Sequence, residues 1–141
     1  MNKIVINVSF GGFSLSKEAL IKFLEFNNFE VEDVIQTDRF LIPSFLFKIK
    51  NVDKNNIPEW LEEDKEHKGY YSVVQHLIPR HDPALIKAVE IIGEDNASNQ
   101  YSKLSIVETN DNEYYIFDYD GYEYLITPTW LKNNSIKINQ P

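Results

Sequence analysis

The chain has no cysteine among its 141 residues, and this absence excludes several kinds of site. Disulfides, thiolate zinc sites and cysteine nucleophiles all require a thiol. Arginine is also scarce, because only Arg39 and Arg80 are present. The 22 acidic residues outnumber the 14 basic ones, which gives a formal net charge of −8. Phosphate binding along a duplex needs a concentrated positive surface, so duplex nucleic acid is not an expected partner.

Long hydrophobic runs are missing as well. No run of 18 apolar residues occurs, so we expect no membrane span, and residues 1–6 have the pattern of a strand rather than of a secretion signal. The expected location is therefore the cytoplasm. A hydrophobic content of 43% and an aromatic content of 13% predict a packed globule, and the length fits one domain over residues 1–141.

The hydrophobic patterns predict an α+β fold, with a mostly antiparallel sheet, two or three helices packed on it and a C-terminal β-meander of three strands over residues 103–126. The expected strands cover residues 3–8, parts of 29–50 with the second part from Phe40 interrupted at Pro43 and Ser44, 70–77, 104–108 and 114–126. A helix capped by Ser14 or Ser16 is expected to end at Asn27 and Asn28. Pro58 is expected to begin a short charged surface helix over residues 59–68, and residues 94–100 to form a polar loop.

The clearest single element is a helix over residues 83–92. Asp82 can cap its first amides, Pro83 suits the first helical position, and Gly93 suits its end. Its buried face is predicted from four apolar residues at helical spacing, namely Leu85, Ala88, Val89 and Ile92.

Arg80 and His81 precede this helix and form one candidate ligand-binding site. A guanidinium, an imidazole and the free amides of a helix N-terminus together attract an anion. The alternative is structural, with Arg80 paired to Asp82 or to another carboxylate.

Gly11, Gly12 and Phe13 form a second candidate, between a predicted strand and a predicted helix. Bare glycine amides can cradle a phosphate or carboxylate. The spacing of a dinucleotide loop and the lysine of a phosphate loop are both missing, so a tight turn with a serine cap is the other interpretation.

The tyrosine-rich hairpin over residues 114–126 turns at Asp120 and Gly121, a strong hairpin signal. A two-residue turn places Tyr119 opposite Tyr122 on an aromatic face, and Asp118 opposite Glu123 on the other face. Opposed carboxylates are unfavourable unless a cation or solvent relieves them. The aromatic face can stack a base or sugar, with Tyr119 and Tyr122 as candidate ligand contacts, or it can be core or a subunit interface. Its size predicts a homo-oligomer.

We expect no enzymatic turnover, since no nucleophile motif, phosphate loop or metal set is visible. The three histidines lack metal-site spacing, and no cofactor is expected. If a metal-dependent reaction exists, its first candidate ligands are His76, His81 and Asp82.

Four motifs occur in order along the chain and resemble a family of short uncharacterised proteins frequent in bacteriophage genomes. They are GGFSLS at residues 11–16, RHDPALIKAVEIIGE at 80–94, SKLSIVE at 102–108 and YDGYE at 119–123. The resemblance implies a phage or prophage origin and action in the host cytoplasm during infection. By association with other small acidic phage proteins, it implies a counter-defence role. Two hypotheses follow: sequestration of an anionic, nucleotide-derived immune signal, or inhibition of a host protein by an acidic interaction surface or nucleic-acid mimic.

Overall fold

A computed structural model describes residues 1–39 and 42–138 of the chain, and it has an α+β fold. All strand pairings among these residues are antiparallel. The strands are β1 (Asn2–Asn7), β2 (Val31–Arg39), β3 (Ile42–Ile49), β4 (Leu61–Glu63), β5 (Tyr70–Val73), β6 (Leu104–Thr109), β7 (Tyr115–Tyr119) and β8 (Tyr122–Ile126). The helices are α1 (Lys17–Phe26), the 3-10 turn η1 (Gln75–Leu77), α2 (Pro83–Ile92), α3 (Glu94–Ala97) and α4 (Pro128–Asn134).

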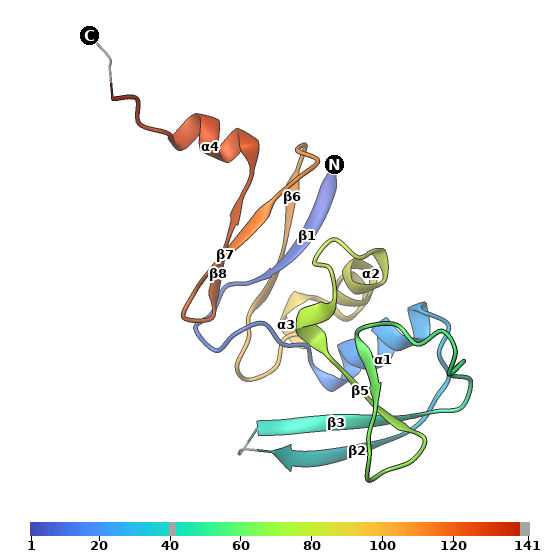
Figure 1. The fold of residues 1–141 in the computed structure, drawn as a ribbon. Helices are drawn as coiled ribbons and strands as arrows, with labels where there is room; N and C mark the ends of the chain where they lie inside the picture. The colour runs from blue at the N-terminus through green and yellow to red at the C-terminus, as the bar shows by residue number, and fades with distance from the viewer. Residues whose placement is uncertain (40–41, 139–141) are drawn as a thin grey trace.

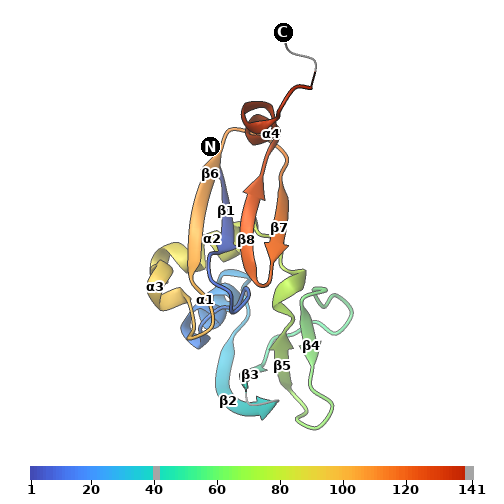
Figure 2. The same cartoon turned by 90° about the vertical axis from the view of Figure 1, so that its left-hand side faces the viewer.

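The strands form two groups that the helices connect (Figure 1). One group is a sheet in the order β2-β3-β5-β4. In the other group β1 pairs with β6 and β7 pairs with β8, and β1 also contacts β8, so the four strands lie in a row (Figure 2). Helix α1 contacts β2 and α2, and α2 contacts β1. One hydrophobic core therefore includes buried residues from both groups of strands and from the helices, such as Val5, Leu104, Phe47 and Phe23 of α1.

The predicted helix caps are confirmed. Asp82 accepts hydrogen bonds from the amides of Ala84 and Leu85, with Pro83 at the first helical position of α2. Of the two serines proposed for α1, Ser16 is the cap, because its Oγ accepts from the amide of Ala19 at 3.2 Å.

The hairpin prediction is confirmed in its register, with Tyr119 opposite Tyr122 and Asp118 opposite Glu123. Asp120 and Gly121 both have positive φ, as a two-residue hairpin turn requires. The predicted three-stranded meander is wrong in its first strand, since β6 pairs with β1 rather than with β7. The C-terminal strands β7 and β8 therefore form a strand pair, which α4 follows.

The predicted surface helix over residues 59–68 is wrong. This segment contains β4, which pairs with β5, followed by a turn in which Asp64 accepts from the amides of Glu66 and His67. Trp60 and Leu61 are buried in the core, where the Trp60 ring lies 4.6 Å from that of Phe23. Trp60 and Leu61 are buried only because other parts of the chain pack against them, and the sequence of the segment alone does not indicate this.

Three smaller predictions are also corrected. Strand β3 continues through Pro43 and Ser44. At these residues it pairs with β2 but not with β5, so no hydrogen bond to β5 is lost because proline lacks an amide hydrogen. Phe40 lies outside the described residues. Residues 70–77 form a strand only as far as Val73, and η1 follows. The expected loop after Gly93 begins with α3, whose Ala97 is buried.

Candidate functional site

Arg80 lies between η1 and α2, and its guanidinium is bound to Glu123 of β8. Nη1 and Nη2 donate to Oε1 and Oε2 of Glu123 at 2.6 and 2.8 Å. The side chains are 15% and 4% exposed, so this is a largely buried bidentate ion pair. The guanidinium carbon also lies 3.6 Å from the centre of the Phe13 ring, within cation–π range.

Arg80 and Glu123 also supply hydrogen-bond acceptors to the edge of β1 that faces away from β6. The amide of Val5 donates to the carbonyl of Arg80 at 2.9 Å, and the amide of Asn7 donates to Oε1 of Glu123 at 2.8 Å. The fully buried Asn7 side chain donates to the carbonyl of Gly121 and accepts from the amide of Lys103. This polar network joins β1, the segment before α2, the hairpin and the segment before β6.

Of the two interpretations of Arg80, the geometry favours carboxylate pairing, with Glu123 as the partner in place of Asp82. Both terminal guanidinium nitrogens are engaged, and Asp82 already accepts from two amides at the start of α2. The sequence carried one signal of this pair. Glu123 faces Asp118 across the hairpin, an arrangement that calls for a cation, and Arg80 supplies it.

The Gly11–Gly12 loop is packed closely against two other backbone segments. A Cβ on Gly11 would lie 1.8 Å from the carbonyl oxygen of Tyr101, and one on Gly121 would lie 2.6 Å from that of Phe10. Gly12 has φ +91° with open space around it. Two of these three glycines thus permit a close approach of backbone to backbone.

His81 faces a different part of the surface from the loop. Its Nδ1 lies 2.7 Å from the Tyr114 hydroxyl, beside a hollow of about 470 Å³ that Lys3 and Asp111 also line. Burial raises the pKa of Tyr114 above its ordinary value, although the positive charge of Arg80 opposes the shift. His76 is exposed on η1. Within residues 1–39 and 42–138, no group of three His, Asp or Glu side chains is arranged to hold a metal ion.

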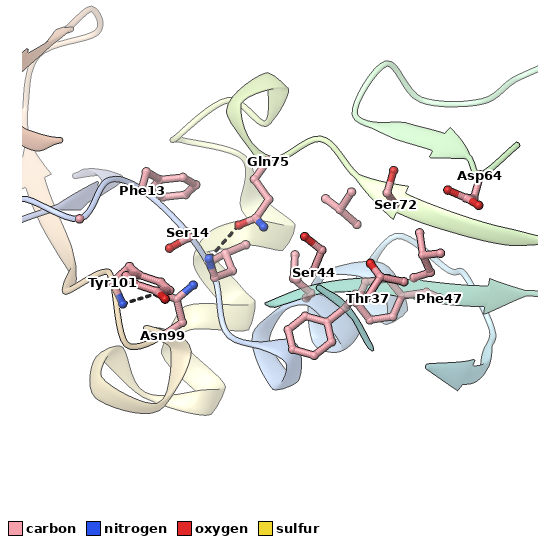
Figure 3. Close-up of a pocket in the computed structure, with 16 residues that line it drawn as sticks. Phe13, Ser14, Thr37, Ser44, Phe47, Asp64, Ser72, Gln75, Asn99 and Tyr101 are labelled. Atoms are coloured by element: carbon pink, nitrogen blue, oxygen red, sulfur yellow. Dashed lines mark hydrogen bonds between the residues drawn. The ribbon is translucent and has the colours of Figure 1, made fainter. Parts of the chain in front are cut away.

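A cleft of about 380 Å³ lies on the other side of the Gly11–Phe13 loop, between the loop, the β2–β3 hairpin and the start of η1 (Figure 3). Phe13, Phe45 and Tyr101 supply aromatic rings to its wall, and hydroxyl side chains supply much of the rest. Among the described residues that line the cleft, Asp64 alone is charged. Hydrogen bonding by His67 holds the pKa of Asp64 below its ordinary value.

Two amide side chains give this cleft directed hydrogen-bond donors. Oε1 of Gln75 accepts from the amide of Leu15 at 2.7 Å, and Oδ1 of Asn99 accepts from the amide of Tyr101 at 2.8 Å. Because both carbonyl ends are fixed to the backbone, the NH₂ ends point the other way, toward the cleft (Figure 3). Neither NH₂ group has a partner within the described residues, and sequence reasoning had singled out neither side chain.

The hairpin carries an exposed set of rings, here called the aromatic face: Tyr115, Phe117, Tyr119 and Tyr124, which are 46–64% exposed. Tyr122 shares this face of the hairpin but is half-buried against Phe10, with ring centres 5.4 Å apart. Of the two predicted tyrosine contacts, Tyr122 therefore lies near the Gly11–Gly12 loop, whereas Tyr119 lies in solvent.

Comparison of the chain with protein-family models, with curated proteins and with solved structures gives no match. No helix in the described part of the chain is long and apolar enough to cross a membrane.

Proposed function

We propose that this protein is a binding protein without catalytic turnover, which sequesters a small nucleotide-derived molecule in the cleft beside the Gly11–Phe13 loop. The observation that carries the proposal is the pair of outward-facing amide donors of Gln75 and Asn99 next to aromatic rings. Nucleobases offer carbonyl and ring-nitrogen acceptors on a flat aromatic system, and such a site suits both features.

The lining favours the base and sugar of such a ligand over its phosphate. No lysine or arginine is among the described residues that line the cleft, whereas Asp64 is. Any phosphate would then lie toward solvent. Arg80, the anion contact expected from the sequence, is neutralised by Glu123 and acts by positioning Phe13 and the loop.

The resemblance to short phage proteins supports a biological setting for this binding. In that setting a phage-encoded protein acts in the host cytoplasm and removes an immune signalling molecule. Self-association belongs to the same proposal.

Two isosteric variants test the cleft. Gln75→Glu and Asn99→Asp keep the oxygen that accepts from the backbone but replace each NH₂ donor with a carboxylate oxygen. Titration calorimetry with a panel of nucleosides and of linear and cyclic nucleotides should find a ligand whose affinity falls at least about tenfold in each variant. Gln100→Glu is the control, because it adds the same charge at an exposed position outside the cleft lining. If no member of the panel binds, or if the variants bind it as well as the control does, the proposal is wrong.

One observation favours a second candidate function, the inhibition of a host protein. The aromatic face gathers four exposed rings into one apolar patch, a feature that often marks an interaction surface, and the chain as a whole is acidic. Binding of a basic host protein through this face would be abolished by Phe117→Lys and left intact by Gln75→Glu. The two candidates therefore separate with the same set of variants.

A further inference from the structure

The aromatic face has no cover within the described residues, and its composition is unusual for the surface of this chain. Its four rings are 46–64% exposed, yet the hairpin places Asp118 and Glu123 on the opposite side. The face itself therefore carries no charge, in a protein whose net charge is −8. A surface of this kind is expected to be covered by a partner.

A second apolar surface without cover lies at the C-terminal end of the described chain. Residues 128–138, here called the arm, comprise α4 and the segment after it, and they extend away from the rest of the molecule (Figure 1). Trp130 and Leu131 are 47% and 50% exposed, and Ile136 and Ile138 are more than 90% exposed. The arm contains Lys132 and Lys137 and no acidic residue, so its charge is opposite to that of the whole chain.

Hydrogen bonds fix the direction in which the arm leaves the hairpin. Oγ1 of Thr127 accepts from the amide of Trp130 at 3.1 Å. Asp111 accepts from the amide and from the hydroxyl of Thr129 at 3.0 and 2.8 Å. At the base of the arm Leu131 lines a hollow with Tyr115 of its own hairpin, whereas the segment after α4 extends away from the molecule (Figure 1).

We propose that two copies of this chain exchange arms, so that the arm of each copy covers the aromatic face of the other. The exchange is reciprocal about a two-fold axis and joins two surfaces that are both uncovered in one copy. The apolar residues of the arm pack on the rings, and its lysines lie near two acidic residues at the ends of the hairpin, Glu113 and Asp120.

The areas agree with a stable dimer. Four rings of roughly 200 Å² each, about half exposed, offer on the order of 400 Å² per face, and the arm offers a similar area. Two face–arm contacts then bury on the order of 1,600 Å² in total, which is typical of a specific interface. The inference rests on the self-association included in the proposed function and adds which segments meet.

Charge-swapped variants test the exchange by complementation. Tyr124→Lys alters the face, and Ile136→Glu alters the arm, at positions that are 51% and 93% exposed and so tolerate substitution. Sedimentation equilibrium at micromolar concentration should give about twice 16.5 kDa for the unaltered chain and about 16.5 kDa for each variant alone. In an equal mixture of the two variants, one face–arm contact is unaltered, and the other brings the introduced lysine and the introduced glutamate together. The mixture should therefore recover dimers.

The control and the contrary outcomes are distinct. Ile91→Lys changes an exposed apolar residue of α2 outside both surfaces, and it should leave the dimer intact. A monomeric unaltered chain would overturn both the exchange and the self-association of the proposed function. A dimer that persists in either variant, or variants that fail to complement each other, would overturn the exchange alone. Ligand binding to the cleft is measured separately and stands or falls on Gln75 and Asn99.

Discussion

The Arg80 guanidinium and the Glu123 carboxylate form a bidentate pair at 2.6 and 2.8 Å, between β1 and the C-terminal hairpin. Glu123 also accepts from the amide of Asn7, so one carboxylate satisfies donors from two segments. Arg80 and Glu123 each belong to a motif on which the resemblance to short phage proteins depends. The pair gives these two residues a structural role in this fold.

We predict that Glu123→Gln destabilises the protein by about 3–5 kcal/mol, because it leaves a buried guanidinium without its counter-charge. Urea denaturation measures the loss. Glu90→Gln is the matched control, since the Lys3–Glu90 pair has a similar 2.8 Å distance but is 38% and 44% exposed, and its loss should be much smaller. Arg80→Ala should likewise lower the melting temperature, because it leaves the carboxylate of Glu123 without its counter-charge. Equal effects at Glu123 and Glu90 would contradict the structural role.

Gly11 and Gly12 should differ in their tolerance of a methyl group. In Gly11→Ala the new Cβ would overlap the Tyr101 carbonyl, so backbone must move, and we expect a loss of at least about 3 kcal/mol. In Gly12→Ala the Cβ enters open space, and only the left-handed backbone is penalised, by about 1–2 kcal/mol. Thermal unfolding of the two variants checks the order. If the loop instead bound a phosphate through its amides, the two variants would have similar stabilities, and both would lose affinity for the ligand.

Ser14 and Ser16 should respond to alanine in opposite directions. The Oγ of Ser14 is buried and has no hydrogen-bond partner within residues 1–39 and 42–138. Its removal should raise the free energy of unfolding by about 1 kcal/mol, because an unsatisfied buried hydroxyl is unfavourable. Ser16 caps α1, so Ser16→Ala should lower it by about 1 kcal/mol. Denaturant midpoints that shift in the same direction would show that the two hydroxyls have been assigned wrongly.

Local signals in the sequence were sufficient for the elements whose ends are set by neighbouring residues. Asp82, Pro83 and Gly93 define α2, and the Asp120–Gly121 turn fixes the hairpin register down to its last pair. The segment around Trp60 was not predictable in this way, because its charged residues fit a surface helix until Phe23 and the β5 strand provide a core and a pairing partner.

Local sequence signals likewise predicted only part of the candidate site. The two glycines indicated the Gly11–Phe13 loop, and Arg80 was selected because the chain has only two arginines. The contact between Arg80 and Glu123 spans 43 residues, and no local pattern encodes such a separation. Gln75 and Asn99 were missed because each has an ordinary polar side chain. Only the backbone amides of Leu15 and Tyr101 give their NH₂ groups a direction.

The attachment of the arm should depend on pH through Asp111. Hydrogen bonds from the amide and then the hydroxyl of Thr129 hold the pKa of this carboxyl below its ordinary value of 3.8. A carboxyl whose pKa is lowered by folding stabilises the folded arm fully above the unfolded pKa, and this contribution is lost as the pH falls through the lower folded value. We therefore expect the amide resonance of Thr129 to shift in acid with a midpoint below 3.8. In Asp111→Ala this titration should be absent, and the arm should reorient at every pH. A midpoint at or above the ordinary value would mean that Asp111 does not hold α4 and does not set the direction of the arm.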